Sequence, residues 1–235
     1  MRMNKISLAC VVLGGSALLA ACGGGGGDGD AALTLKGTAA VGAPLVGAIT
    51  ATCKTGTGSA TSNSDGTYTV AIVGGVGPCL LKIEPATGAT LYSITSGSGA
   101  TQTANITPMT NMLVTYLLKV PGMEAATPEA WFAQPAVKTL LTDTAALSTR
   151  ITRDFLPALR TLLPTLSVAN TDFLFMAFVA NPAASATDAD LEKLRTAGVV
   201  TSTGEPSAAA ASALATSAAN ATPVVGATGA TGAGS

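Results

Sequence analysis

The chain contains no histidine, and that absence removes several classes of catalytic site. Ser-His-Asp and Cys-His nucleophile systems need an imidazole as the general base, and catalytic zinc is commonly held by histidine. The sequence also lacks Cys-x-x-Cys, Ser-x-x-Lys, Gly-x-Ser-x-Gly and Walker A motifs. An enzyme built on this chain would have to work with carboxylates alone. We therefore predict a non-enzymatic protein without catalytic, cofactor-binding or metal-ligating residues.

Charged residues are also scarce, at 11% of the chain, and neither sign dominates. Once the N-terminal leader described below is removed, ten basic residues stand against 13 acidic ones. A nucleic-acid-binding domain usually carries clustered Lys and Arg, so no nucleic-acid partner is expected. The chain equally lacks a polybasic patch for a membrane surface, so membrane attachment would have to rest on lipid.

The first residues carry the pattern of a bacterial lipoprotein signal, assigned to residues 1–21. Arg2 and Lys5 form a positive start, an apolar stretch follows, and Leu19-Ala20-Ala21-Cys22 has the form of a lipobox. We expect cleavage between Ala21 and Cys22, and acylation of the Cys22 thiol. Cys22 would then attach the protein to a membrane.

A transmembrane anchor is the alternative interpretation of this leader. A helix that crosses the hydrocarbon core needs about 20 apolar residues. The apolar stretch from Ile6 to Leu19 is shorter, and Gly14, Gly15 and Ser16 interrupt it. The lipoprotein interpretation is therefore favoured.

Residues 22–32 are expected to form the acylated cysteine and a Gly-rich tether. Gly23 follows Cys22, where an aspartate commonly retains Gram-negative lipoproteins in the inner membrane. Glycine there favours the outer membrane, on its periplasmic or surface face. Asp28 and Asp30 are a conceivable calcium pair, but within a polyglycine segment they are better explained as keeping the linker soluble.

Cys53 and Cys79 are the two cysteines left after the leader and the lipid site are set aside. An even pair in an exported chain is typical of a disulfide. Closing a loop of this length would stabilise the fold by about 3.5 kcal/mol in the chain-entropy model. The alternative is two buried free thiols.

Residues 33–106 consist of short alternating segments separated by turn residues. This pattern is typical of a small antiparallel β-sandwich of the immunoglobulin or transthyretin type. The strongest turn signal is Asn63-Ser64-Asp65-Gly66, where Asp65 can cap the backbone and Gly66 can take a positive φ. The strand candidates lie at 33–37, 48–53, 68–72, 79–83, 91–94 and 103–106.

At Thr107 the apolar period changes from two to 3.6, and a helical region is expected over 107–204. Thr107 suits an N-cap and Pro108 the first helical position. One face of the first helix is expected to pack on the sandwich: Met109, Met112 and Tyr116. The overall expectation is an α+β fold.

Later helices are expected to begin near Pro128 and Pro135. Pro157 and Pro164 should kink or divide the second of these. Residues 205–235 are assigned to a disordered, low-complexity tail. Its alanine-rich part, 207–221, would be only marginally helical in isolation.

Three groups of residues resemble a known family. Residues 37–83 resemble the carboxypeptidase regulatory-like, or transthyretin-like, β-sandwich through Gly42-Ala43-Pro44-Leu45, Cys53, Asp65-Gly66-Thr67-Tyr68 and Pro78-Cys79. Asn105-Ile106-Thr107-Pro108-Met109-Thr110 is similar to the element that follows such domains in envelope lipoproteins of Gram-negative bacteria. Trp131-Phe132 and residues 188–194 resemble elements of their C-terminal halves. The resemblance implies a non-catalytic sandwich followed by a helical region.

The densest acidic cluster is Asp188, Asp190 and Glu192. A carboxylate pair could serve a glycosidase-type hydrolase. The preferred explanation is a capped helix start, because Thr187 and Asp190 have capping-box spacing and acids favour the positive end of a helix. Gly198 would then end that helix.

Aromatic residues make up only 4% of the chain, so each one matters. Trp131 and Phe132 are expected to be core residues rather than a ligand platform. The leading hypothesis is a non-enzymatic, lipid-anchored envelope protein with a structural or interaction role. The alternative, a glycan- or protein-binding adhesion module, would be favoured by an exposed aromatic cleft near Tyr68, Tyr92 or Trp131. A carboxylate-based hydrolase ranks third.

Overall fold

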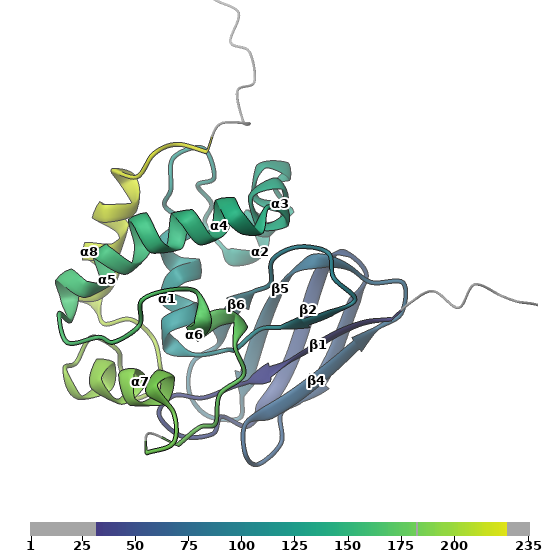
Figure 1. Cartoon of the computed structure of the whole chain (residues 1–235), viewed down its shortest axis with the longest axis horizontal. Helices are drawn as coiled ribbons and strands as arrows, with labels where there is room; N and C mark the ends of the chain where they lie inside the picture. Colours follow the sequence, from purple (N-terminus) through teal and green to yellow (C-terminus); the bar gives the residue numbers. More distant parts are fainter. Residues whose placement is uncertain (1–31, 182, 225–235) are drawn as a thin grey trace, which may run out of the picture.

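The computed structural model describes residues 32–181 and 183–224, which form an α+β fold (Figure 1). In the described chain the strands come first and the helices follow. This order confirms the predicted fold class. Ala21 and Cys22 lie outside the described residues.

Four strands form one antiparallel sheet in the order β3-β2-β5-β6. Their bounds are β2 (Gly47–Thr55), β3 (Thr57–Thr61), β5 (Val76–Pro85) and β6 (Leu91–Ile94). The other sheet has the order β4-β1-β7. It consists of β1 (Leu33–Thr38), β4 (Thr67–Ile72) and β7 (Thr101–Thr103).

One hydrophobic cluster contains buried side chains from both sheets, whereas Leu80 and Ile94 belong to the core of the helical region. Burial alternates along β4, where Tyr68, Val70 and Ile72 are buried and the residues between them are exposed. Side chains from the other sheet, such as Ile49 and Leu81, belong to the same cluster. The period-two pattern in the sequence therefore predicted which face of these strands is buried.

Two strands differ from the prediction. β3 was not predicted, because Thr57–Thr61 has no large apolar residue and forms an edge strand whose position is set by pairing with β2. The last strand, expected at 103–106, ends at Thr103 and pairs with β1 in parallel rather than antiparallel. Ile106 keeps only a single bridge, to Ala39.

The turn before β4 has the predicted chemistry. The Asp65 carboxylate accepts hydrogen bonds from the Thr67 amide at 2.9 Å and the Thr67 hydroxyl at 2.7 Å. These bonds favour the ionised form and lower the pKa of Asp65. Gly66 has a φ of +81°, a conformation that L side chains rarely adopt.

The first helix, α1 (Pro108–Leu117), begins as predicted. The Thr107 hydroxyl accepts from the Thr110 amide at 3.2 Å, and the Thr110 hydroxyl accepts from the Thr107 amide at 2.9 Å. Met109, Met112 and Tyr116 are buried, which confirms the interpretation of this face as core. α1 packs against β6, so the helical region adjoins the four-stranded sheet.

The next helices divide at Asp143 rather than at Pro157. α2 (Pro128–Ala133) and α3 (Pro135–Thr142) are followed by α4 (Thr144–Arg150), which Asp143 caps. A π-helical segment, η1 (Ile151–Phe155), joins α4 directly to α5 (Leu156–Leu162).

Pro157 therefore lies inside a continuous helix and does not divide it. A proline removes one amide donor from a helix interior, and the wide π turn directly precedes it. The chain divides instead at Asp143, whose carboxylate accepts from the Ala146 amide. The end of α5 at Leu162 agrees with the division predicted at Pro164.

α6 (Asp172–Phe175) is a single helical turn. α7 (Ala186–Thr196) begins two residues earlier than predicted. Its N-cap is Ser185, which accepts from the Asp188 amide, rather than Thr187. Gly198, with a φ of +66°, follows its end as expected.

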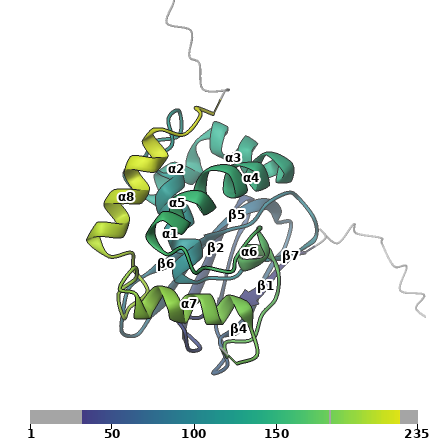
Figure 2. The ribbon, with the colours of Figure 1, turned by 60° about the vertical axis from the view of Figure 1, so that its left-hand side comes forward.

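The last helix, α8 (Ala208–Ala219), corrects the predicted tail. Residues 205–235 were assigned to a disordered segment, yet Ala210, Leu214 and Ala218 of α8 are buried in the helical core. α8 lies along α1 and α5 (Figure 2). The alanine-rich sequence is a weak helix former in isolation, and packing on these helices provides the missing stabilisation. Residues 225–235 lie outside the described residues.

Asn105 joins the β region to the helical region. Its side-chain oxygen accepts from the Thr38 amide at 3.2 Å, and its side-chain nitrogen donates to the carbonyls of Phe173 at 3.1 Å and Met176 at 2.7 Å. Its own amide donates to the Leu174 carbonyl. Asn105 is completely buried, so it ties β1 to the α6 segment at the point where the chain enters α1.

No helix within residues 32–181 and 183–224 is long and apolar enough to cross a membrane.

Candidate functional site

The predicted disulfide is present. Cys53 of β2 and Cys79 of β5 are directly paired in the sheet and joined by a disulfide, with their Cα atoms 3.9 Å apart. The pair therefore links two neighbouring strands of one sheet. The other predicted site residues, Ala21 and Cys22, lie outside the described chain.

The aromatic residues considered for a ligand cleft are mostly core residues. Trp131 and Phe132 are buried, as expected. Tyr68 is also buried; its hydroxyl donates to the Ala104 carbonyl, and burial raises its pKa. Tyr92 alone is half-exposed, and burial and its hydrogen bond to Glu129 raise its pKa to about 12. The described residues therefore place no cluster of exposed aromatics at these positions.

Within the acidic cluster on α7, Asp190 has a structural role. Its buried carboxylate accepts from the Ser167 amide, the Ser167 hydroxyl and the Val168 amide, at 2.8–2.9 Å to the Oδ2 atom. Lys193 forms an ion pair with the other oxygen at 2.7 Å. Asp190 thus fastens the chain after α5 to α7.

Asp188 is different, because neither of its buried oxygens has a hydrogen-bond partner among the described residues. Burial, and secondly the charge of Glu192, raise the pKa of its carboxyl. Glu192 is itself paired with Arg195. Since Asp188 is completely buried, a substrate has no access to it in this conformation.

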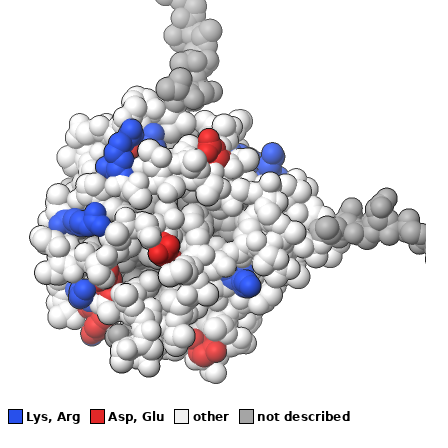
Figure 3. Space-filling model, viewed as in Figure 1, with Lys and Arg blue, Asp and Glu red and all other residues white. Residues whose placement is uncertain are grey.

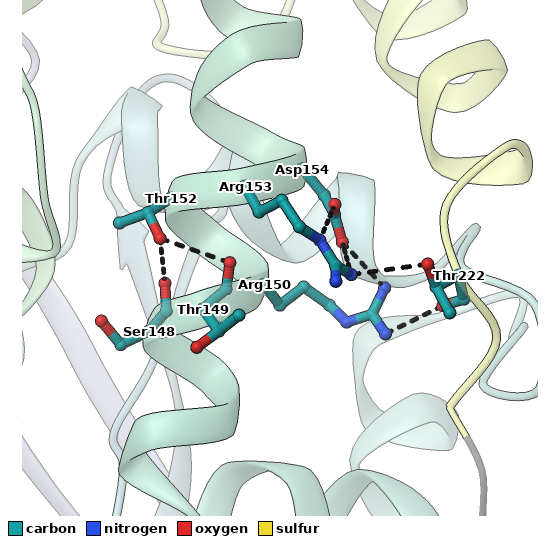
Figure 4. Close-up of polar contacts among 7 residues, drawn as sticks. All are labelled: Ser148, Thr149, Arg150, Thr152, Arg153, Asp154 and Thr222. Carbon is teal, nitrogen blue, oxygen red and sulfur yellow. Dashed lines mark hydrogen bonds and ion pairs between the residues drawn. The ribbon is translucent and has the colours of Figure 1, made fainter.

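A partly buried cluster of charged side chains surrounds the π segment (Figure 4). Arg150 donates to the Asp154 carboxylate at 3.3 Å, and Arg153 donates to it at 2.8 and 3.1 Å. Both arginines reach Thr222, which follows α8: Arg150 binds its carbonyl at 2.9 Å and Arg153 its hydroxyl at 3.5 Å. Two cations and one carboxylate leave this cluster with one net positive charge.

A pocket of about 640 Å³ opens beside this cluster, between η1 with α5 on one side and α8 on the other. Tyr116, Arg153 and Asp154 contribute to one wall. The opposite wall is formed by α8 and the residues after it, namely Ala213, Thr216, Ser217, Asn220 and Ala221. The pocket therefore presents a cation, a carboxylate, an amide and several hydroxyls at short range.

The Tyr116 hydroxyl is the most informative group of the pocket. It is buried, and among the described residues it has only a contact with Ser217 that does not reach standard hydrogen-bond geometry. Burial and the charge of Asp154 raise its pKa, while Arg150, Ser217 and Arg153 act in the opposite direction. A buried hydroxyl without a partner is costly, so a polar ligand group could satisfy it.

A larger hollow of about 680 Å³ lies between Lys54 and α3. It is lined by exposed or half-exposed side chains, including Lys138 and Asp143, and no buried polar group faces it. For that reason we take the pocket at η1 and α8 as the candidate site.

Sequence reasoning missed this site, although it contained a signal. Arg150, Arg153 and Asp154 bring three charges into five residues of a chain that is otherwise poor in charge. The i,i+4 spacing of Arg150 and Asp154 suits an ion pair on a helix. The other wall could not be foreseen, because α8 was assigned to the tail.

Charges elsewhere on the described surface are sparse. On the face shown in Figure 3, basic and acidic side chains lie scattered, and neither sign gathers into a patch. This distribution offers no electrostatic footprint on that face, and the absence of a nucleic-acid partner remains a prediction.

No protein-family model, curated protein or solved structure matches this chain. The likeness to the carboxypeptidase regulatory-like domain and to envelope lipoproteins therefore remains a prediction.

Proposed function

We propose that this chain is a non-enzymatic lipoprotein of the Gram-negative envelope, anchored through Cys22 in the outer membrane. The lipobox pattern at residues 19–22 supports the anchor. The arrangement of the described residues bears on the orientation of an anchored chain. β1 begins at one end of the long axis, and α8 lies toward the other (Figure 1). An anchored chain would thus hold its pocket away from the attachment point.

The role supported best is that of an interaction or structural protein. The three largely buried acids in polar clusters are engaged or inaccessible: Asp190 binds backbone amides, Asp154 binds two arginines, and Asp188 is buried. The resemblance to a non-catalytic sandwich points in the same direction.

The anchor is tested by replacing Cys22 with alanine in cells supplied with a labelled fatty acid. We expect the wild type to take up label and to fractionate with outer membranes, and Cys22→Ala to do neither. Cys10→Ala is the matched control and should behave as wild type. Membrane fractionation of Cys22→Ala at wild-type levels would refute the lipid anchor.

Glycan binding is the second candidate function, favoured by the pocket at η1 and α8. Sugar hydroxyls are well matched by a carboxylate, a guanidinium, an amide and hydroxyls, and the free Tyr116 hydroxyl needs such a partner. Titration with soluble peptidoglycan fragments and with outer-membrane oligosaccharides tests it.

In that titration we expect Asn220→Ala to weaken binding at least tenfold, because Asn220 lines the pocket. In the fold, its exposed side chain donates only to the Thr216 carbonyl of the same helix. Asn170→Ala is an exposed control outside the pocket and should bind as wild type. If the wild type shows no saturable binding, glycan binding is refuted and the structural role is the remaining proposal.

A further inference from the structure

One end of the β region combines the entry of the chain with exposed apolar residues. Leu33, the first residue of β1, pairs with Ile72, the last residue of β4. Thr55 at the end of β2 pairs with Val76 at the start of β5. The Thr34 amide binds the Ala100 carbonyl. The segments 54–57, 73–76 and 97–100 therefore gather where β1 begins, and we call them the anchor-proximal tip.

Val73 and Val76 are the exposed apolar residues of this tip, with 78% and 40% of their surface accessible. The turn between them is tight: the Gly75 amide donates to the Ile72 carbonyl at 3.0 Å, and Gly74 has a φ of +64°. A Cβ on Gly75 would lie 2.7 Å from the Ile72 side chain. The turn therefore projects Val73 on a well-defined backbone.

The charges of the tip are compatible with an anionic lipid surface. Lys54 is the one charged residue in the three segments, and none of them contains an acid. Lys138 lines the adjoining hollow together with Lys54, and Asp143 is the acidic residue there. Lysines beside exposed apolar side chains suit the headgroup region of a bilayer.

The length of chain before β1 limits how far the tip can be from an anchored lipid. Ten residues lie between Cys22 and Leu33, so the chain takes eleven residue steps from one to the other. A fully extended chain of that length spans at most about 40 Å. The tip adjoins Leu33, where β1 begins, so it lies within reach of a membrane that holds Cys22.

We infer that the anchor-proximal tip rests on the membrane that holds the acyl chains, with Val73 and Val76 in the interface and Lys54 among the headgroups. This inference rests on the proposed lipid anchor. Two valines alone bind a bilayer weakly, and the anchor raises their effective concentration at the surface. The contact would orient the molecule with α8, toward the other end of the long axis, away from the bilayer (Figure 1).

The chain offers a matched control for this contact. Val46 is also exposed, at 50%, but it precedes β2 at the opposite end of the sheet. There Gly47 pairs with Pro85, the last residue of β5. The two ends of β2 are roughly 26 Å apart at the usual rise per strand residue.

The test uses acylated full-length protein in vesicles of phosphatidylethanolamine and phosphatidylglycerol, part of them with brominated acyl chains. Val73→Trp, Val76→Trp and Val46→Trp are compared by fluorescence after subtraction of the wild type, whose Trp131 is buried. We expect at least twofold quenching of the tryptophan at 73, weaker quenching at 76, and none at 46. The disulfide and circular dichroism of each variant should match the wild type.

Flotation of the same vesicles separates the two proposals. If the acylated variants float with lipid but the tryptophan at 73 is no more quenched than that at 46, the tip contact is wrong and the anchor stands. If correctly acylated protein does not float, the anchor fails and the tip contact fails with it. Val73→Asp with Val76→Asp should still float, which shows that the acyl chains and not the valines hold the protein.

Discussion

The β region, residues 33–106, and the helical region, residues 107–224, are held together by different means. In the four-stranded sheet, backbone ladders pair neighbouring strands and one cross-strand disulfide joins β2 to β5. In the helical region, buried polar side chains bind distant backbone groups. Asp190 binds the Ser167 amide 23 residues away, and Arg150 binds the Thr222 carbonyl 72 residues away.

The two regions should lose stability in different ways when single residues are replaced. In the sheet, each strand is held by many backbone hydrogen bonds, and the covalent bond restricts the unfolded chain. A buried polar contact is more sensitive, because losing one partner leaves the other without water or a hydrogen bond. The helical region should therefore depend on a few single residues, whereas the β region should depend on its disulfide and its alternating core.

The largest effect is expected where the two regions meet. Asn105→Ala leaves the Thr38 amide and the carbonyls of Phe173 and Met176 without their buried partner. We expect the free energy of unfolding to fall by about 4 kcal/mol, measured by urea denaturation. Asn170→Ala, which removes an exposed amide, is the control and should change it by less than about 1 kcal/mol. Equal effects of the two variants would show that the junction is not critical.

Removal of the disulfide should affect the β region. Cys53→Ala with Cys79→Ala is expected to lower the free energy of unfolding by about 3.5 kcal/mol. Hydrogen exchange should rise first in β2 and β5, and less in α7 and α8. A reducing agent should bring the wild type to the stability of the double variant. An unchanged wild type in reductant would contradict this account.

α8 tests whether the end of the described chain belongs to the helical region. Leu214 is completely buried there. Leu214→Ala should cost about 3 kcal/mol through the lost burial and the cavity it leaves. Ser212→Ala, on the exposed face of the same helix, should be nearly neutral. If the Leu214 variant were as stable as wild type, α8 would be a dispensable tail.

The smallest effect is expected at Asp188. Because its pKa is raised in the folded state, the folded protein binds the proton more tightly than the unfolded chain. The free energy of unfolding should fall as the pH rises from the ordinary value of 3.8 through the raised pKa, and the penalty is complete above it. Asp188→Asn is therefore expected to be more stable than wild type at pH 7, by about 1 kcal/mol.

The comparison across pH checks the cause. Near pH 3 the wild-type carboxyl is protonated, so the advantage of Asp188→Asn should vanish. Asp190→Asn should act in the opposite sense at pH 7, because that carboxylate is bonded to two amides, a hydroxyl and Lys193. Destabilisation by both variants at pH 7 would refute the distinction between the two acids.

Sequence patterns were sufficient where the physics is local. The α+β order, the Asp65-Gly66 turn, the Thr107 cap with Pro108 and the burial face of α1 follow from periodicity, φ preferences and capping within a few residues. The Cys53–Cys79 pairing followed from counting cysteines. For the candidate site, the only signal in the sequence was the i,i+4 spacing of Arg150 and Asp154, which favours an ion pair on a helix.

Tertiary structure decided what depends on distant partners. The edge strand β3 and the parallel pairing of β7 arise from neighbouring strands, and α8 is helical because α1 and α5 cover it. The same holds for Asp188 and Asp190, two residues apart on α7, of which one is unpartnered and the other has four partners. Composition determined that this chain would fold with few charges and without histidine chemistry. Only packing determined where its few polar groups are buried, because the free energy of a buried group is set by neighbours that sequence distance does not reveal.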